Sequence, residues 1–138
     1  MPERLGVAAD EVDGVLPREL DTLQRASVEL DALVGSGDDD GERYRPGDLD
    51  PPPRLIVRTA GASGGEYEAG EHERGHWVAT PLPGPVSDLY GCGDSFAAGF
   101  THGLGAGMPV ADALELGARC GAACATGRGP FAGQLRSV

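Results

Sequence analysis

A chain of 138 residues has the length of one domain or of a piece of a larger one, and its 40% apolar residues can form a core that is poor in aromatic rings (5%). The 11 basic and 22 acidic residues give a formal net charge of −11, which argues against nucleic acid or an anionic membrane surface as a partner. No apolar run reaches the ~18 residues of a membrane span and no signal peptide opens the chain, so a cytoplasmic protein is predicted.

The basic residues are all arginine, and this composition removes several kinds of chemistry. Without lysine the chain has neither the lysine of a Walker A loop, which reaches the β- and γ-phosphates, nor a Schiff-base lysine. Its three cysteines, Cys92, Cys120 and Cys124, include no Cys-x-x-Cys pair, so neither a disulfide framework nor a zinc site is predicted. A phosphate site in this chain must be built from backbone N–H groups, arginine and a metal ion.

The first half of the chain is predicted to hold one helix and several short strands. A helix is expected over residues 17–26, which have proline in the first turn and Leu20 and Leu23 on one face. Alternating apolar and polar residues predict a strand over 28–34, and a compact apolar strand is expected over 54–59 after a loop rich in glycine, proline and charge. The segments "GEYE" and "GHWVAT" predict a hairpin around a charged turn.

Two helices are predicted in the second half. The first begins near Asp94 and ends around residues 103–107, and the second begins with Pro109 and ends by Gly127. The order helix, strand, strand, hairpin, helix, helix is typical of an α/β fold.

The segment "SDLYGCGDSFAAGF" places a glycine loop and an aspartate at the start of the first of these helices. A helix N-terminus has unpaired N–H groups and partial positive charge, and glycine lets the backbone approach a ligand, so such a loop suits a phosphate. A carboxylate beside a bound phosphate is expected where a proton must be taken from an attacking hydroxyl. The pattern therefore predicts phosphoryl transfer to an alcohol, with Asp94 as the base.

Simpler interpretations exist for these residues and for two other motifs. Aspartate is a favoured N-cap, so Asp94 can be interpreted as a helix cap alone. The Gly-x-Ser-x-Gly sequence at residues 61–65 would make Ser63 a hydrolase nucleophile only if a helix followed it. His72 and His76 have a spacing that would bind zinc only on a helix, and the glycines around them favour a turn.

The glycine loop also resembles the C-terminal signature of the ribokinase-like carbohydrate kinases of the phosphofructokinase-B (PfkB) type. That signature reads Asp-Thr-x-Gly-Ala-Gly-Asp-Ser-Phe, followed by x-Ala-Gly-Phe and Gly-Leu, and this chain has "DLYGCGDSFAAGFTHGL". Upstream, "LIVRTAGASGG" is similar to the family's strand ending in Thr-x-Gly-x-x-Gly, and the resemblance covers roughly residues 18–135. It implies an α/β fold, a ribokinase-like three-layer sandwich with a central, mostly parallel sheet between helices, here only as its C-terminal part in a single region, 1–138.

The resemblance implies a role for each matching position. Asp94 matches the catalytic base that deprotonates the sugar hydroxyl. Asp88, with the backbone carbonyl of Tyr90, matches the start of a monovalent-cation site found in many members. The anion hole that holds the γ-phosphate matches three consecutive residues, Gly91, Cys92 and Gly93.

Other matching positions would serve the nucleotide and its metal ion. The family's Asn-x-x-Glu reads here as Ser36-x-x-Asp39, so Asp39 is the expected position for holding a water on Mg²⁺. Cys92 stands where the family has alanine, and Leu89 stands where it has threonine. The positions expected along the nucleotide are Thr59, Gly61 and Gly64, and those expected near the adenine or the cation loop are Cys120, Cys124 and Gly129.

The function implied by the resemblance is an ATP-dependent phosphotransferase that moves the γ-phosphoryl of ATP to a hydroxyl of a sugar or related alcohol. Its cofactors would be ATP, Mg²⁺ and, as in many members, K⁺, and its partners a nucleotide and a small-molecule sugar. Family members are much longer than 138 residues, and the N-terminal half with the sugar contacts and lid is not in this sequence. The alternative is therefore a truncated, non-catalytic kinase remnant that binds nucleotide weakly, or a folded module that oligomerises through an exposed sheet edge.

Overall fold

The computed structural model describes residues 17–39 and 44–136, and it divides the chain into two compact units. One unit comprises Met1–Ala60 and Gly65–His76, and the other comprises Gly61–Gly64 and Trp77–Val138. Among the described residues, no helix is long and apolar enough to cross a membrane. The elements are α2 (Pro17–Ala26), β1 (Leu33–Ser36), β2 (Leu55–Thr59), η2 (Gly61–Ser63), β3 (Gly65–Ala69), β4 (Glu73–Trp77), α3 (Cys92–Gly105), α4 (Val110–Cys124) and α5 (Gly129–Ala132).

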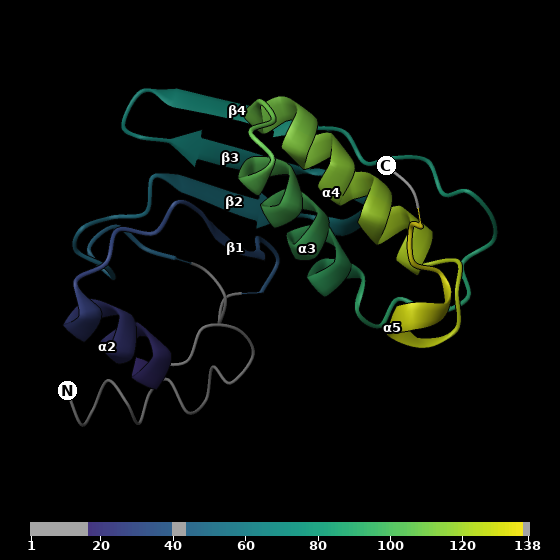
Figure 1. Ribbon diagram of the computed structural model, residues 1–138, viewed down its shortest axis with the longest axis horizontal. Helices are drawn as coiled ribbons and strands as arrows, with labels where there is room; N and C mark the ends of the chain where they lie inside the picture. Colours follow the sequence, from purple (N-terminus) through teal and green to yellow (C-terminus); the bar gives the residue numbers. More distant parts are fainter. Residues whose placement is uncertain (1–16, 40–43, 137–138) are drawn as a thin grey trace. The chain divides into compact units, whose positions relative to one another are not determined.

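The strands form a four-stranded sheet in the order β1-β2-β3-β4 (Figure 1). β1 pairs with β2 in parallel, with Leu33 opposite Ile56, and β2 pairs with β3 in the antiparallel sense. Side chains alternate between the faces of a strand, so Leu55 and Val57 of β2 are buried on one face, at 5% and 1% exposed. Arg58 is on the other face, where its guanidinium forms an ion pair with Glu68 at 2.8 Å. Helices and a sheet with a parallel pair confirm the predicted α/β class.

The helix predicted over residues 17–26 is confirmed as α2, and its side chains reach the loop before β2. The Gln24 amide donates to the carbonyl of Asp50 at 3.1 Å and accepts from the N–H of Asp50 at 2.8 Å. This pair of bonds satisfies both backbone groups of one loop residue and holds α2 against that loop.

The strand predicted over residues 28–34 is wrong in its position, because β1 is Leu33–Ser36. Ser27 has a left-handed φ of 52° directly after α2, and Val28 is 57% exposed, so the chain joins the sheet only later. Gly35 and Ser36 are poor strand formers, yet they pair with Arg58 and Thr59 of β2. Pairing with a neighbouring strand therefore overrides local propensity here.

The second unit is built on α3 and α4, which lie side by side in Figure 1. α3 ends where Gly107 adopts a left-handed φ of 81° and the N–H of Met108 donates to the carbonyl of Gly103 at 3.0 Å. Pro109 then stands at the N-cap of α4. Phe100 and Leu114, from the two helices, are at most 1% exposed and form the core of this unit.

Glycines allow the two helices to approach closely. A Cβ on Gly99 of α3 would lie 2.6 Å from Sγ of Cys120, and a Cβ on Gly117 of α4 would lie 2.9 Å from the carbonyl oxygen of Phe96. Neither position has room for a larger side chain without movement of its neighbour. α3 is therefore packed closely against α4, and this packing includes its first residue, because a Cβ on Gly121 of α4 would lie 3.2 Å from the carbonyl oxygen of Cys92.

Candidate functional site

The predicted glycine loop and the first turn of α3 form the candidate site. α3 begins at Cys92, two residues before the predicted start, and Gly91 is its N-cap with a left-handed φ of 82°. A Cβ on Gly91 would lie 2.7 Å from Cβ of Pro130, so both the backbone conformation and the close approach require glycine.

The first turn of α3 leaves backbone N–H groups free for a ligand. The N–H of Cys92 donates to the carbonyl of Leu89 at 3.3 Å, and that of Ser95 donates to the carbonyl of Gly91 at 2.9 Å. The N–H groups of Gly93 and Asp94 have no partner among residues 17–39 and 44–136. A Cβ on Gly93 would meet nothing within 4 Å, so the backbone at this point is open to an approaching group. Free N–H groups at the positive end of a 14-residue helix suit an anion.

Asp94 is an exposed residue of the first turn and not its cap. The N-cap is Gly91, and the helix has no side-chain capping bond. Within the part of the chain that the structure describes, the Asp94 carboxylate makes no hydrogen bond and no ion pair. The interpretation of Asp94 as a helix cap is therefore wrong, and its carboxylate is available to a ligand.

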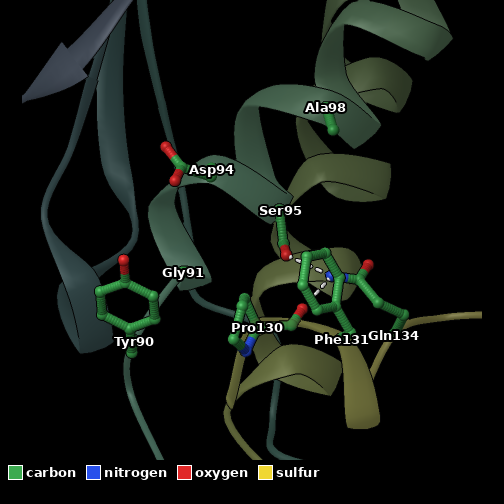
Figure 2. A pocket seen from close by; sticks show the side chains of 8 residues that line it. All are labelled: Tyr90, Gly91, Asp94, Ser95, Ala98, Pro130, Phe131 and Gln134. Carbon is green, nitrogen blue, oxygen red and sulfur yellow. Dashed lines mark hydrogen bonds between the residues drawn. The ribbon is translucent and has the colours of Figure 1, made fainter.

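A hollow of about 350 Å³ lies beside this turn. Figure 2 shows that its walls come from the loop before α3, from the first two turns of α3, and from α5 and the residue Gln134 beyond it. Asp94 supplies the one carboxylate of the lining, and Tyr90 and Phe131 are aromatic rings at 72% and 81% exposed. The lining residues are Tyr90, Gly91, Asp94, Ser95, Ala98, Pro130, Phe131 and Gln134.

Asp88, the predicted cation ligand, connects the loop before α3 to the segment after α4. Its Oδ1 accepts from the N–H of Tyr90 at 3.0 Å, and its Oδ2 accepts from the N–H of Gly129 at 2.9 Å. These two bonds favour the ionised form and hold the pKa of the Asp88 carboxyl below its usual value. The structure therefore brings three predicted site residues together, because Asp88 is hydrogen-bonded to both Tyr90 and Gly129.

The cysteines lie at the contact between α3 and α4. Cys124 is buried, and its thiol lies 3.7 Å from the carbonyl oxygen of Tyr90 and 3.8 Å from that of Pro130. Burial, a hydrogen bond with the Cys124 thiol and the nearby charge of Asp88 raise the pKa of the Cys92 thiol to about 11. Cys120 packs against Gly99, and burial raises the pKa of its thiol as well. All three behave as small packing residues.

The remaining predicted site residues lie around β1, β2 and η2. Thr59 is the last residue of β2, where its hydroxyl donates to the carbonyl of Gly35 at 3.4 Å, and Asp39 follows β1 by three residues. Gly61 and Gly64 both have left-handed φ values, 52° and 85°, and Gly64 lies against the backbone of Trp77. The structure places Thr59 and Asp39 in the first unit and the two glycines in the second.

Two alternative motifs fail in the structure. Ser63 is followed by the strand β3 and not by a helix, so it is not on a nucleophile elbow. His72 lies in the turn before β4 and His76 lies on that strand, which removes the helical spacing needed for zinc. Among the described residues no group of three His, Cys, Asp or Glu side chains could hold a metal ion.

Sequence reasoning missed the contribution of the segment that follows α4. α5 was not predicted, and neither were Ser95 and Gln134 as lining residues of the site. Ser95 is 6% exposed and its hydroxyl accepts a hydrogen bond from the Gln134 amide at 2.9 Å. No local pattern relates two residues that are 39 positions apart in the chain.

Similar structures share this fold over part of their length. A protein described as a ribokinase II from E. coli, solved with ATP and Mg²⁺, superposes with a TM-score of 0.68 at 25% sequence identity. The superposition covers 87% of this chain and 41% of the E. coli chain. Ribokinase from Cryptococcus neoformans, solved with ADP, gives a TM-score of 0.56 at 27% sequence identity. This superposition covers 83% of this chain and 37% of the ribokinase chain. The chain thus spans about two fifths of the length of these structures.

Sequence comparison agrees with the structural one. A 5-dehydro-2-deoxygluconokinase from Geobacillus thermodenitrificans is 45% identical over 42 residues, which are 30% of this chain and 12% of that protein. The family model for the pfkB family of carbohydrate kinases matches residues 29–135, most of the chain and all of the candidate site. The chain therefore belongs to the pfkB carbohydrate kinase family.

Proposed function

We propose that this chain is the nucleotide-binding and catalytic part of an ATP-dependent carbohydrate kinase, which transfers the γ-phosphoryl group of ATP to a hydroxyl of a sugar or related alcohol. The observation that carries the proposal is the first turn of α3, where the unpaired N–H groups of Gly93 and Asp94 stand next to the free carboxylate of Asp94, beside a hollow of about 350 Å³. Phosphoryl transfer to an alcohol needs a binding site for the anionic phosphate and a base for the hydroxyl proton, and the two must lie next to each other.

In this proposal the N–H groups of the turn stabilise the charge that develops on the transferred phosphoryl oxygens. They are fixed before the reaction, because α3 is packed against α4 through Gly99 and Gly117, so little reorganisation is needed as charge develops. Gly91 and Gly93 allow the phosphate to approach the backbone. The Asp94 carboxylate takes the proton of the acceptor hydroxyl as the oxygen attacks.

A magnesium ion that arrives with the nucleotide is part of this proposal. Mg²⁺ is usually held by one or two carboxylates together with substrate phosphates and waters, and the described residues contain no cluster that would hold it alone. Asp39 would act through a water on this ion. Mg²⁺ would supply charge neutralisation of the phosphates, which no lysine in this chain can supply.

A monovalent cation is proposed at Asp88 and the carbonyl of Tyr90. In the structure both carboxylate oxygens of Asp88 accept backbone N–H bonds, and each retains a further lone pair for an ion. K⁺ at this point would act on the loop before α3, because Asp88 joins that loop to Gly129.

The second candidate is a non-catalytic module that binds nucleotide weakly or only folds. An oligomer formed through an exposed sheet edge belongs to this candidate.

Calorimetric titration of the chain with ATP, in the presence of Mg²⁺ and K⁺, separates the two candidates when it is combined with a transfer assay against sugars. Asp94→Asn is expected to lower the transfer rate by about 10²–10⁴-fold, because the base is lost, while the affinity for ATP changes only a few-fold. Transfer that survives this substitution would eliminate Asp94 as the base. Absence of ATP binding by a folded chain would favour the non-catalytic module.

A further inference from the structure

The short segment from Gly129 to Gln134 contacts the loop before α3 and the first turn of α3, which is the proposed phosphate-binding turn, at three successive points. The N–H of Gly129 donates to Asp88, and Pro130 lies against Gly91. The amide of Gln134 then donates to Ser95 at 2.9 Å. The contacts follow one another in the same direction along both segments, so residues 129–134 run alongside the loop and the first turn of α3.

Ser95 is the residue through which this segment can act on the turn. Its N–H donates to the carbonyl of Gly91, which closes the first turn of α3, and its hydroxyl accepts from Gln134. Ser95 is 6% exposed and follows Asp94 directly. Both ends of the turn are therefore in contact with residues 129–134, Gly91 through Pro130 and Ser95 through Gln134.

The Gln134 amide nitrogen makes two hydrogen bonds. Its Nε2 donates both to the Ser95 hydroxyl and to the carbonyl of Pro130, which uses the two N–H bonds that an amide nitrogen has. The bond to Pro130 ties Gln134 to its own segment, and the bond to Ser95 ties that segment to α3. In Figure 2 two dashed lines leave the Gln134 amide, one to the Ser95 hydroxyl and one to the carbonyl of Pro130.

We propose that Gln134 is a positioning residue, which acts through the Ser95 hydroxyl to hold the first turn of α3 in the geometry that phosphoryl transfer requires. Gln134 itself is not proposed to touch the reacting atoms. The inference rests on the proposed function for its effect on the rate, but its effect on the turn can be measured without any activity. Small displacements of a positioned group lower catalytic rates strongly, so the expected effect on the rate is large for an exposed residue.

The test compares Gln134→Met, which keeps the length of the side chain and removes its N–H donors, with Arg136→Ala as the control. Arg136 is an exposed residue two positions after this segment, and it does not line the hollow. Amide hydrogen exchange resolved by residue reports on the turn, because the Ser95 N–H is the bond that closes it. Exchange at Ser95 is expected to be about tenfold faster in Gln134→Met and unchanged in Arg136→Ala.

Kinetics supply the second measurement. Gln134→Met is expected to lower kcat about tenfold with a smaller change in the affinity for ATP, since the substitution moves the base more than it removes binding groups. Ser95→Ala removes the other partner of the bond, so the double variant is expected to be no worse than Ser95→Ala alone. This cycle also serves if Gln134→Met lowers the stability of the chain, because the two single variants break the same bond from opposite sides.

The outcomes are distinct. Unchanged exchange at Ser95 in Gln134→Met overturns the inference, whatever the activity. Faster exchange with an unchanged kcat, or additive effects in the double variant, overturns it as well. Faster exchange in a chain that binds ATP but transfers no phosphoryl group supports the positioning of the turn and instead contradicts the proposed function.

Discussion

Gly91 and Pro130 are in direct contact, and a Cβ on Gly91 would lie 2.7 Å from Cβ of Pro130. Gly91 also has a left-handed φ of 82°, which costs a residue with a Cβ roughly 1–2 kcal/mol. Gly91→Ala is therefore expected to lower the free energy of unfolding by about 2 kcal/mol or more, as measured by urea denaturation.

Gly93→Ala is the matched control for this prediction. A Cβ on Gly93 would meet nothing within 4 Å, and its position is helical, so alanine is expected to raise the free energy of unfolding by about 0.5–1 kcal/mol. The same substitution is expected to weaken ATP binding, because in the proposed function the new methyl group would lie where the phosphate approaches. Equal stability of the two variants would contradict the requirement for glycine at Gly91.

The ionisation of Asp88 predicts a pH dependence of stability. Its pKa is lowered in the folded chain by the N–H groups of Tyr90 and Gly129, so its stabilisation is present above the ordinary value of 3.8 and is lost as the pH falls through the lower, folded value. Asp88→Asn keeps one acceptor oxygen and therefore at most one of these bonds. The variant is expected to melt at a lower temperature than the natural sequence at pH 7, and the difference is expected to shrink as the pH falls below 3.8 and to vanish only below the lower pKa of the folded chain. A difference that persists in acid would show that charge is not the cause.

The close contact of α3 and α4 predicts opposite effects at two glycines of one helix. A Cβ on Gly99 would lie 2.6 Å from Sγ of Cys120, so Gly99→Ala is expected to lower the free energy of unfolding by about 1–3 kcal/mol. Gly105, in the last turn of α3, has open space around it, and alanine there is expected to be neutral or stabilising. Thermal melting of the two variants checks the prediction, and a destabilised Gly105→Ala would contradict it.

The Cys92 thiol is predicted to react slowly with alkylating agents. Its pKa of about 11, compared with an ordinary 9.0, lowers the reactive thiolate fraction at neutral pH about a hundredfold. Labelling with iodoacetamide, followed by mass spectrometry of the peptides, is expected to modify Cys92 far more slowly than in the urea-denatured chain. Rapid labelling of the folded chain would show that burial and the Cys124 contact are not maintained.

Features that depend on neighbouring residues in the chain could be predicted from the sequence. The amphipathic spacing of Leu20 and Leu23 predicted α2 with its observed bounds, and the glycine loop predicted the start of α3 within two residues. The family resemblance was confirmed over residues 29–135. The roles of Asp94, Asp88 and the residues near the nucleotide remain predictions.

The parts that the sequence did not predict depend on contacts between distant residues. Leu33–Ser36 forms β1 because it pairs with β2, although glycine and serine give no local strand signal. Gln134 and Ser95 became related only through the path of residues 129–134 beside α3. A glycine-proline start such as that of α5 indicates a turn from local pattern, and its place beside Gly91 is set by tertiary packing.

The contacts of residues 129–134 also bear on the order in which the chain acquires its final form during synthesis. The hydrogen bond of Asp88 can form only after Gly129 has been synthesised, 41 residues later in the chain. The hydrogen bond of Ser95 can form only after Gln134, 39 residues later. On a ribosome, α3 can therefore be complete while the loop before it still lacks its lateral support. At about 5–20 residues per second, this interval of translation lasts a few seconds. During it the helix can exist while the end that is proposed to bind phosphate lacks its contacts with residues 129–134.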